Sequence, residues 1–290
     1  MTNELTLATI CMNATADFNR NVTRAETLVR RAASLGGNWV MLPEMFSYYG
    51  PYDKLWEHSE PEGDALYQRF SSLAKELGIV LFTGTLNEKP TEKDLTSIRP
   101  VSEKGYKRVY NTLYIFGRNG ELLGKYRKTH LFNLYDEQGQ ALFCEASGFI
   151  QGNELKIVEI DSFKIGLAIC FEVRFPGIFS KLNKMGPPDV LALPAAFTLS
   201  TGTYHWETLL RARAIENLCY VFASNQTGAH AKEPNARASS GHSMIIDPWG
   251  NKLADTGDIE SVALSVISKE RIAACRVKLP VAKNLRPELY

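Results

Sequence analysis

Three residues with reactive side chains stand at the ends of short apolar segments that are typical of buried strands. Glu44 closes the sequence NWVMLPE, Lys128 closes LLGKYRK, and Cys170 closes FKIGLAIC. An ionised group at the end of a buried strand is costly unless it is paired or has a function. A carboxylate, an ammonium and a thiol could together perform acyl transfer, with a base, an electrostatic stabiliser and a nucleophile. Taken alone, Glu44 and Lys128 are better explained as solvated strand ends, and Cys170 is equally well explained as a buried core cysteine.

Cys170 has the most informative position of the three. It ends a predicted central strand and precedes a helix that we predict over residues 175–185. Open α/β sheets place their sites at the carboxyl ends of such strands. A helix N-terminus close behind lowers the pKa of a thiol, and backbone N–H groups such as that of Phe171 can bind an oxyanion. We therefore expect an activated thiol, with all three residues at strand ends of one parallel sheet.

Motifs of other common chemistries are absent from the sequence. GxGxxG, GxxxxGK[ST] and GxSxG do not occur, which argues against a dinucleotide site, a P-loop and a serine hydrolase. The histidines lack HExxH spacing and the cysteines lack a CxxC pair, which argues against a metal site. We expect no metal and no organic cofactor, and a reduced, cytoplasmic protein whose remaining thiols are mostly buried: Cys11, Cys144, Cys219 and Cys275.

The elements that would position these residues alternate along the chain. Apolar periodicity predicts helices over residues 17–35, 64–77, 175–185 and 204–218. It predicts strands over residues 4–12, 38–43, 79–88, 109–116, 122–126, 163–170, 190–195, 219–225, 241–247 and 261–267. Residues 89–104 are polar and indicate a surface loop. We expect a single α/β domain over residues 1–290.

Charge and hydrophobicity exclude several kinds of partner. The 290 residues include 33 Lys and Arg against 32 Asp and Glu, for a net charge of +1, so a nucleic acid is not expected. The longest apolar segments are too short to cross a bilayer. The first residues lack a basic segment followed by a long apolar one, so we expect neither a signal peptide nor a membrane partner.

Six segments together resemble the carbon–nitrogen hydrolases of the nitrilase superfamily: LPEMF, YRKTHLF, KIGLAICFEVRFPG, LALPAAFTLSTGTYHWETLLRARAIEN, GHSMIIDPWG and LPVAKNLRPELY. The resemblance implies an α-β-β-α sandwich that pairs into a dimer through helices including the one after the nucleophile. It also implies that Glu44 is the general base, Lys128 the transition-state stabiliser and Cys170 the nucleophile. Members of the family often have a second glutamate between the lysine and the cysteine. The resemblance assigns this position best to Glu145, with Glu137 as the other candidate.

Within that superfamily, the sequence most resembles the branch of deaminated glutathione amidase and omega-amidase. This implies a cysteine-dependent amidase for a small, carboxylate-bearing amide of an α-keto acid, such as deaminated glutathione, through a thioester. Omega-amidase activity on α-ketoglutaramate is the alternative. A nitrilase, an N-carbamoyl amidohydrolase and a silent binding module are further alternatives. NLYDEQGQ, the insert near 89–104 and Phe171-Glu172 depart from the family pattern beside the pocket, which leaves the substrate open.

The implied substrate contacts follow the nucleophile in the chain. Arg174, four residues after Cys170, either forms a structural salt bridge, for example with Glu172, or holds a substrate carboxylate bidentately. We expect Phe171 beside the reacting carbonyl and an opposite wall formed by residues of AAFTLSTG: Phe197, Thr198 and Thr201. The expected partners are a small-molecule amide and further copies of the chain, in a homodimer or a higher homo-oligomer.

Overall fold

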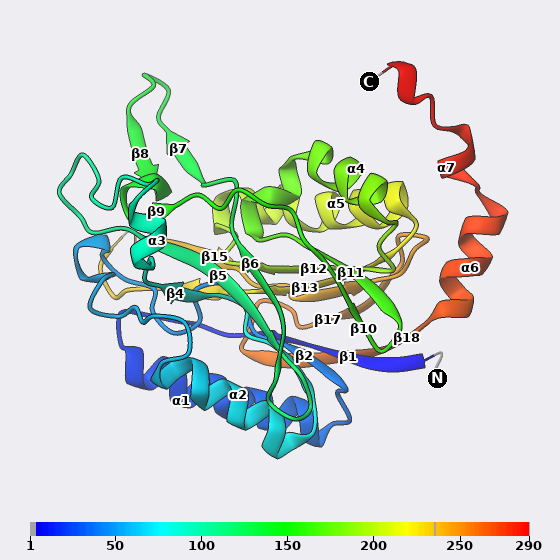
Figure 1. Cartoon of the computed structure of the whole chain (residues 1–290), viewed down its shortest axis with the longest axis horizontal. Helices are drawn as coiled ribbons and strands as arrows, with labels where there is room; N and C mark the ends of the chain where they lie inside the picture. Colours follow the sequence, from blue (N-terminus) through cyan, green and yellow to red (C-terminus); the bar gives the residue numbers. More distant parts are fainter. Residues whose placement is uncertain (1–3, 235, 290) are drawn as a thin grey trace.

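Two β-sheets lie face to face at the centre of the molecule, with helices on both outer faces (Figure 1). This computed structural model describes residues 4–234 and 236–289. Helices α1 (Phe18–Ser34) and α2 (Ala65–Leu77) cover one sheet, and α4 (Pro176–Met185) and α5 (Leu199–Asn217) cover the other. The predicted α-β-β-α sandwich is therefore confirmed.

The first sheet has eight strands. Its central order is β18 (Ser261–Ser268), β1 (Glu4–Cys11), β2 (Trp39–Met41), β3 (Val80–Phe82), β5 (Val109–Phe116) and β4 (Leu86–Glu88), and β6 (Leu122–Arg127) and β9 (Phe149–Ile150) also pair with β5. Strands β1, β2 and β3 are parallel, whereas β6 runs antiparallel to β5. The ends of β2 and β6 carry Glu44 and Lys128 into the space beside the second sheet.

The second sheet has six strands and carries Cys170. Their order is β10 (Ile157–Ile160), β11 (Phe163–Leu167), β12 (Val190–Ala195), β13 (Tyr220–Asn225), β16 (Met244–Ile246) and β17 (Lys252–Asp255). Strands β11, β12 and β13 are parallel and almost wholly buried, as their apolar composition predicts. Two hairpins complete the strands: β7 (Asn133–Tyr135) with β8 (Ala141–Cys144), and β14 (Thr227–Ala229) with β15 (Ala238–Ser240).

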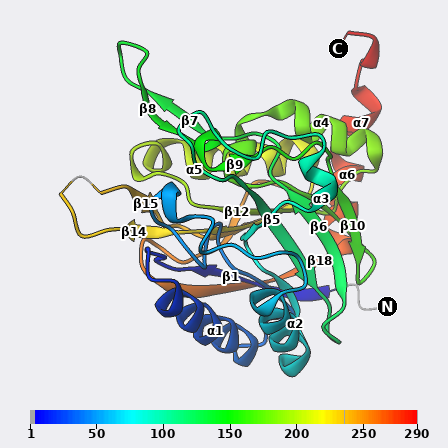
Figure 2. The same cartoon turned by 60° about the vertical axis from the view of Figure 1, so that its left-hand side comes forward.

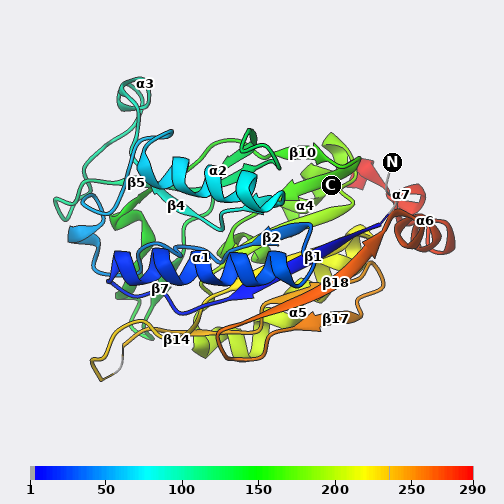
Figure 3. The same cartoon turned by 90° about the horizontal axis from the view of Figure 1, so that it is seen from below.

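Helices α1 and α2 each begin directly after an aspartate that caps the helix N-terminus. The Asp17 carboxylate accepts a hydrogen bond from the Arg20 N–H at the start of α1, and Asp64 caps α2. Figure 3 shows α1 and α2 side by side, where ion pairs join Arg30 to Glu76 and Arg69 to Glu26. The remaining helices are short or lie at the C-terminus: α3 (Glu92–Leu95), α6 (Lys269–Lys278) and α7 (Val281–Asn284).

Both sheets contribute to one apolar core, in which Trp39 and Phe82 pack with residues of the second sheet, including Phe163 and Phe222. Buried hydroxyls also cross between the sheets: Thr9 Oγ1 on β1 donates to the Ala223 carbonyl on β13 at 2.6 Å. Apolar packing and direct hydrogen bonds from buried hydroxyls thus hold the two sheets together. In the described part of the chain, none of the helices combines the length and apolarity required to span a membrane.

Several predicted boundaries were wrong, for identifiable reasons. The run over residues 79–88 is two strands, because Gly84 adopts φ 62° and a Cβ there would lie 2.0 Å from the Pro43 carbonyl. The predicted loop over 89–104 contains the helix α3, which Thr91 and Asp94 cap reciprocally. Helix α5 begins five residues earlier than its apolar spacing predicted, which places Thr201 in its first turns.

Candidate functional site

The centre of the site is the ammonium group of Lys128, which is buried between two carboxylates. Lys128 Nζ lies 2.8 Å from Glu44 Oε1 and 2.9 Å from both Glu145 Oε1 and Oε2. Lys128 directly follows β6, Glu44 follows β2 with two residues between, and Glu145 begins a 3₁₀ turn (Glu145–Ser147) after β8. All three side chains are at most 3% exposed, so water screens their charges little.

Backbone and amide donors fix both carboxylates in place. The Ala196 N–H donates to Glu44 Oε2 at 2.8 Å, and the Phe132 N–H donates to Glu145 Oε2. Asn111 Nδ2 on β5 lies 2.8 Å from Glu44 Oε1 and 3.4 Å from Glu145 Oε1, so one amide contacts both acids. Asn111 was not among the residues predicted for the site. An amide side chain inside the apolar strand VYNTLYIF was the signal that could have found it.

The electrostatic state of this cluster follows from burial and opposite charge. Burial alone would lower the pKa of Lys128, but Glu145 and Glu44 outweigh it and hold that pKa well above its usual range. Burial raises the pKa of Glu145, with Glu44 adding to the effect, while Lys128 and the Phe132 N–H oppose it. Both carboxylates therefore favour the charged form of the buried Lys128 beside the reacting groups.

Cys170 completes the group, at a strained point of the backbone. Strand β11 ends at Leu167, and Cys170 begins a 3₁₀ turn (Cys170–Arg174) with φ 50°, a conformation that is unfavourable for a side chain with a Cβ. The thiol is buried, and the Glu44 carboxylate lies close enough to raise its pKa. Strain at a residue of this kind is characteristic of functional positions.

The prediction of a lowered thiol pKa was wrong. Burial and the negative charge of Glu44 raise the pKa of Cys170 well above its ordinary value, and Lys128 only partly opposes them. Helix α4 begins at Pro176, so the 3₁₀ turn separates Cys170 from the expected helix N-terminus. The resting pair is thus a thiol beside a carboxylate, in which the carboxylate can accept the thiol proton as the sulfur attacks.

The expectation that one parallel sheet supplies all three residues was also wrong. Glu44 and Lys128 come from the eight-stranded sheet, where β6 is antiparallel to its neighbour, and Cys170 comes from the six-stranded sheet. The site therefore lies where the two sheets meet. Glu137 is exposed in the β7–β8 turn, whereas Glu145 is buried against Lys128. The structure thus brings Glu145, and not Glu137, into the cluster.

Glu172 joins the strand that carries Lys128 to the turn that carries Cys170. Its fully buried carboxylate accepts from the Ile169 N–H at 2.7 Å, from the Thr129 N–H at 2.7 Å and from the His130 N–H at 3.1 Å. The hydroxyls of Tyr126 and Thr129 also donate to it. Burial alone would raise the pKa of Glu172, but the His130 side chain and the donors from Thr129 and Ile169 outweigh it and hold that pKa below its usual value. This residue positions two functional segments against each other.

A small pocket opens beside Cys170, and every predicted substrate-contacting residue lines it: Phe171, Arg174, Phe197, Thr198 and Thr201, together with Phe132 and Ala196. The Arg174 guanidinium lies 4.8 Å from the centre of the Phe197 ring, and its Nη1 is 3.2 Å from His205 Nδ1. Within residues 4–234 and 236–289, no carboxylate pairs with Arg174, and Glu172 is fully occupied elsewhere. The predicted structural salt bridge with Glu172 is therefore absent from this part of the chain.

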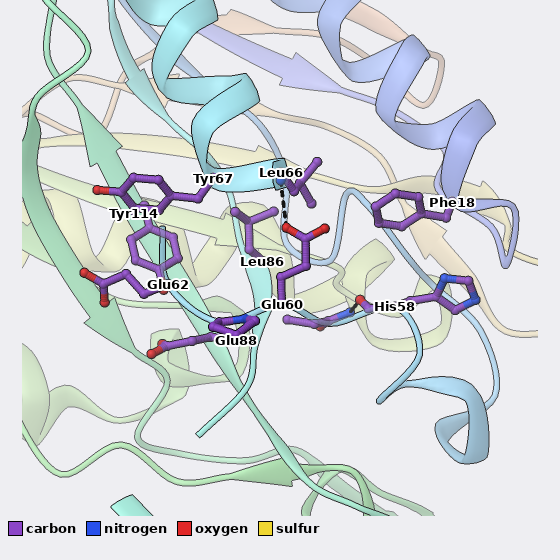
Figure 4. Close-up of a pocket in the computed structure, with 11 residues that line it drawn as sticks. Phe18, His58, Glu60, Glu62, Leu66, Tyr67, Leu86, Glu88 and Tyr114 are labelled. Carbon is purple, nitrogen blue, oxygen red and sulfur yellow. Dashed lines mark hydrogen bonds between the residues drawn. The ribbon is translucent and has the colours of Figure 1, made fainter. Parts of the chain in front are cut away.

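A second pocket, shown in Figure 4, contains several carboxylates but no comparable arrangement. Glu60 Oε2 accepts a hydrogen bond from the Leu66 N–H at 2.7 Å. Glu88 is buried and paired with Lys125 and Arg127. These acids stabilise the start of α2 and the β4–β6 region, and none faces a thiol. The cluster at Cys170 is therefore the candidate active site.

Comparisons with known proteins are consistent with this geometry. The carbon-nitrogen hydrolase family model matches residues 6–277. Deaminated glutathione amidase of Homo sapiens is 36% identical over 291 residues, which cover 99% of this chain and 84% of that protein. Omega-amidase NIT2 of Mus musculus is 34% identical over 98% of this chain and 96% of its own length. The crystal structure of the C. elegans NitFhit protein superposes with a TM-score of 0.86 at 32% identity; the match covers all of this chain but only 66% of that one.

Proposed function

The chain belongs to the carbon–nitrogen hydrolase family and is an amidase, a hydrolase of carbon–nitrogen bonds other than peptide bonds, and on that premise we propose that Cys170 is its nucleophile. In this proposal Glu44 is the general base, Lys128 stabilises the transition state, and Glu145 orients Lys128. One observation carries it: a buried ammonium is held between two carboxylates, and one of them, Glu44, also acts on the buried Cys170 thiol and raises its pKa.

The reaction begins when Glu44 accepts the proton of the Cys170 thiol as the sulfur attacks the amide carbonyl carbon. The carbonyl oxygen becomes an oxyanion, which Lys128 and the backbone N–H of Phe171 stabilise. Each such donor contributes about 3 kcal/mol to transition-state stabilisation. Glu44 then transfers the proton to the amide nitrogen, the carbon–nitrogen bond breaks, and the amine leaves a thioester on Cys170.

Hydrolysis of the thioester uses the same groups. Glu44 takes a proton from a water molecule, whose oxygen attacks the thioester carbonyl carbon. The carbon–sulfur bond then breaks, the acid is released, and the proton returns to the sulfur of Cys170. Asn111 and the Ala196 N–H keep the Glu44 carboxylate in one orientation during both steps. The cycle requires no group beyond those of this chain, the substrate and water.

We infer that the substrate is a small amide of an α-keto acid that carries a carboxylate on its acyl part. The half-buried Arg174 supports this, because it lines the pocket without a carboxylate partner in the described chain. Deaminated glutathione, which would release cysteinylglycine, is the first candidate because of the 36% identity to an amidase of that name. α-Ketoglutaramate, which would release ammonia, is the second.

The assignment of the nucleophile is tested with Cys170→Ala and Cys170→Ser. Both variants should lose turnover of deaminated glutathione and of α-ketoglutaramate while retaining the wild-type circular dichroism, because a serine hydroxyl is too weakly acidic for this base. Cys144→Ala is the matched control, since Cys144 is a half-buried free cysteine that lies next to Glu145. Substantial turnover in a folded Cys170→Ala variant contradicts the assignment.

The role of Arg174 is tested with Arg174→Met, which retains most of the apolar side-chain volume. Loss of a bidentate contact to the acyl carboxylate should reduce kcat/KM about a hundredfold, or roughly 2–3 kcal/mol. The fall should occur for both α-keto acid amides but not for an uncharged amide of equal length. An equal loss for charged and uncharged amides would make Arg174 a structural residue.

We also propose a homodimer in the cytoplasm. Helix α5 exposes large apolar side chains on the outer face of the sandwich, with Tyr204 75% and Leu199 51% exposed, and a second copy could cover them. All five cysteines are free, which fits a reducing compartment. Sedimentation at several concentrations measures the assembly, and a species of 32.4 kDa at all of them contradicts the dimer.

A further inference from the structure

A second arginine, Arg237, lies beside the site without a role in the reaction described above. It directly precedes β15, and its side chain lies over two aromatic rings, 4.2 Å from the centre of Phe143 and 5.0 Å from that of Tyr49. Tyr49 in turn is stacked on His230 at 3.7 Å. In the part of the chain that the structure describes, no carboxylate lies within 4.0 Å of the Arg237 guanidinium. Among the described residues, Arg237 is therefore an exposed cation that lies against two rings and has no anionic partner.

The backbone connects Arg237 to the wall of the Cys170 pocket. Ser239 forms a β-bridge with Thr198, and the Ser240 N–H donates to the Phe197 carbonyl at 3.0 Å. Arg237 stands two residues before Ser239, which is about 7 Å along a strand. Figure 2 shows that the β14–β15 and β7–β8 hairpins project from the same side of the molecule, and the contact of Arg237 with Phe143 joins them. The guanidinium therefore lies at the rim of the site.

Aromatic side chains link this position to the predicted carboxylate-binding arginine. Phe143 lies 5.7 Å from Phe132, Phe132 lies 5.2 Å from Phe171, and the Arg174 guanidinium lies 5.9 Å from Phe171, measured to ring centres. Phe132 and Phe171 both line the pocket. The three rings thus form a continuous edge with Arg174 at one end and Arg237 at the other.

The charge of Arg237 acts on the same groups as the charges of the active site. Burial raises the pKa of Tyr49 to about 12; Arg237 opposes the shift, and Glu44, Cys170 and Glu145 add to it. Tyr49 thus lies within electrostatic range of Arg237 and of the reacting groups. The rings restrict the guanidinium before any ligand arrives, which reduces the entropic cost of binding an anion.

We propose that Arg237 binds the carboxylate of the leaving group, so that the enzyme prefers amides whose amine is an amino acid or a dipeptide with a free carboxylate. This inference rests on the proposed amidase function and extends it to the other side of the scissile bond. Arg174 holds the acyl carboxylate and Arg237 the leaving-group carboxylate. An extended dipeptide places its carboxylate about 7 Å beyond the scissile nitrogen, a length suited to a contact at the rim.

The test compares two substrates that share an acyl group and differ in the amine. For Arg237→Met, kcat/KM for deaminated glutathione should fall roughly 10- to 100-fold, as expected for a lost charge-assisted hydrogen bond. The value for α-ketoglutaramate, which releases ammonia, should stay within about twofold of wild type. Deaminated glutathione with an amidated glycine carboxylate should already be a poor substrate for the wild type and should be unaffected by the substitution.

Controls separate this contact from general effects of charge or folding. Lys232→Met removes another exposed cation from the same hairpin and should leave both substrates unchanged, since Lys232 makes none of the ring contacts that hold Arg237. An equal loss for both substrates in Arg237→Met, or no loss for either, overturns the proposal. So does a wild-type enzyme that hydrolyses α-ketoglutaramate but not deaminated glutathione. A wild type that hydrolyses neither amide instead contradicts the proposed function itself.

Discussion

At the scale of single residues, the site depends on a lysine whose charge two acids share. Glu145→Gln removes one of those charges and leaves Lys128 paired only with Glu44, so we expect kcat to fall about a hundredfold while KM changes little. Glu137→Gln is the matched control, because Glu137 is exposed in the β7–β8 turn. Steady-state kinetics of both variants measure the difference. A silent Glu145→Gln beside an impaired Glu137→Gln would reverse the choice between the two acids.

The reactive residues of the site were predictable where a polar or ionisable side chain stands at the end of an apolar segment. Glu44, Lys128 and Cys170 stand out in this way, and the structure brings them together. Asn111 was not predicted, because a neutral amide within a strand is compatible with many hydrogen-bonded roles. The direction of the pKa shift of Cys170 was also predicted wrongly. It depends on burial and on the distance to Glu44, and the sequence reports neither.

At the scale of elements, the relation between β6 and the turn after β11 depends on Glu172. Glu172→Gln keeps one acceptor oxygen and loses the other along with the charge, so the free energy of unfolding should fall by about 2–3 kcal/mol. Because Lys128 and Cys170 would then be less well aligned, kcat should fall more than KM rises. Urea unfolding and steady-state kinetics measure the two effects.

The control for this prediction is Glu159→Gln, a change of the same type at an exposed position of β10. It should alter neither stability nor kcat. If Glu172→Gln lowers stability while a folded sample keeps the wild-type kcat, the carboxylate stabilises the fold without positioning the site. Wild-type stability would contradict the hydrogen-bond argument altogether.

Most helices and strands were predictable from periodicity and caps, and the failures have local causes. The apolar segment FKIGLAIC does not show that strand β11 ends at Leu167, since a buried turn can be as apolar as a buried strand. The β7–β8 hairpin lacks an alternating apolar face, because much of it is exposed. Its pairing arises from the turn at Asp136, whose carboxylate accepts from the N–H groups of Gln138 and Gln140.

At the scale of the whole molecule, stability should decrease in mild acid because of His230. Its ring is buried between the Ala14 carbonyl and the Ser239 hydroxyl, and burial lowers its pKa to about 4. The unfolded chain protonates this histidine near pH 6.5, whereas the folded chain does so only near pH 4. The free energy of unfolding therefore falls as the pH decreases between these values, by about 2 kcal/mol from pH 7 to pH 5.

Urea denaturation at pH 7 and pH 5 tests this, with His230→Gln as the comparison. The variant should be less stable at pH 7 but should lose about 2 kcal/mol less than the wild type between the two pH values. An identical pH dependence in both proteins would assign acid sensitivity to other groups. Because His230 stacks on Tyr49, the same experiment reports on the integrity of the Arg237 side of the site.

The α-β-β-α sandwich was predicted from the family resemblance and not from the spacing of apolar residues. Apolar patterns predict which segments are buried strands, but they do not assign strands to sheets. For that reason Glu44, Lys128 and Cys170 were placed in one sheet, although the structure distributes them over two. Sheet-to-sheet packing is a long-range property that local sequence does not encode.

The two carboxylates that flank Lys128 also affect what happens after the chemistry. Hydrolysis converts a neutral amide carbonyl into a carboxylate next to Glu44 and Glu145, and one lysine balances only one of those negative charges. A like-charge pair about 4 Å apart costs on the order of 4 kcal/mol at the effective dielectric of a protein interior. The acid product is therefore repelled from the place where it forms. Product inhibition by the acid should be weak, and resynthesis of the amide on this enzyme should be correspondingly disfavoured.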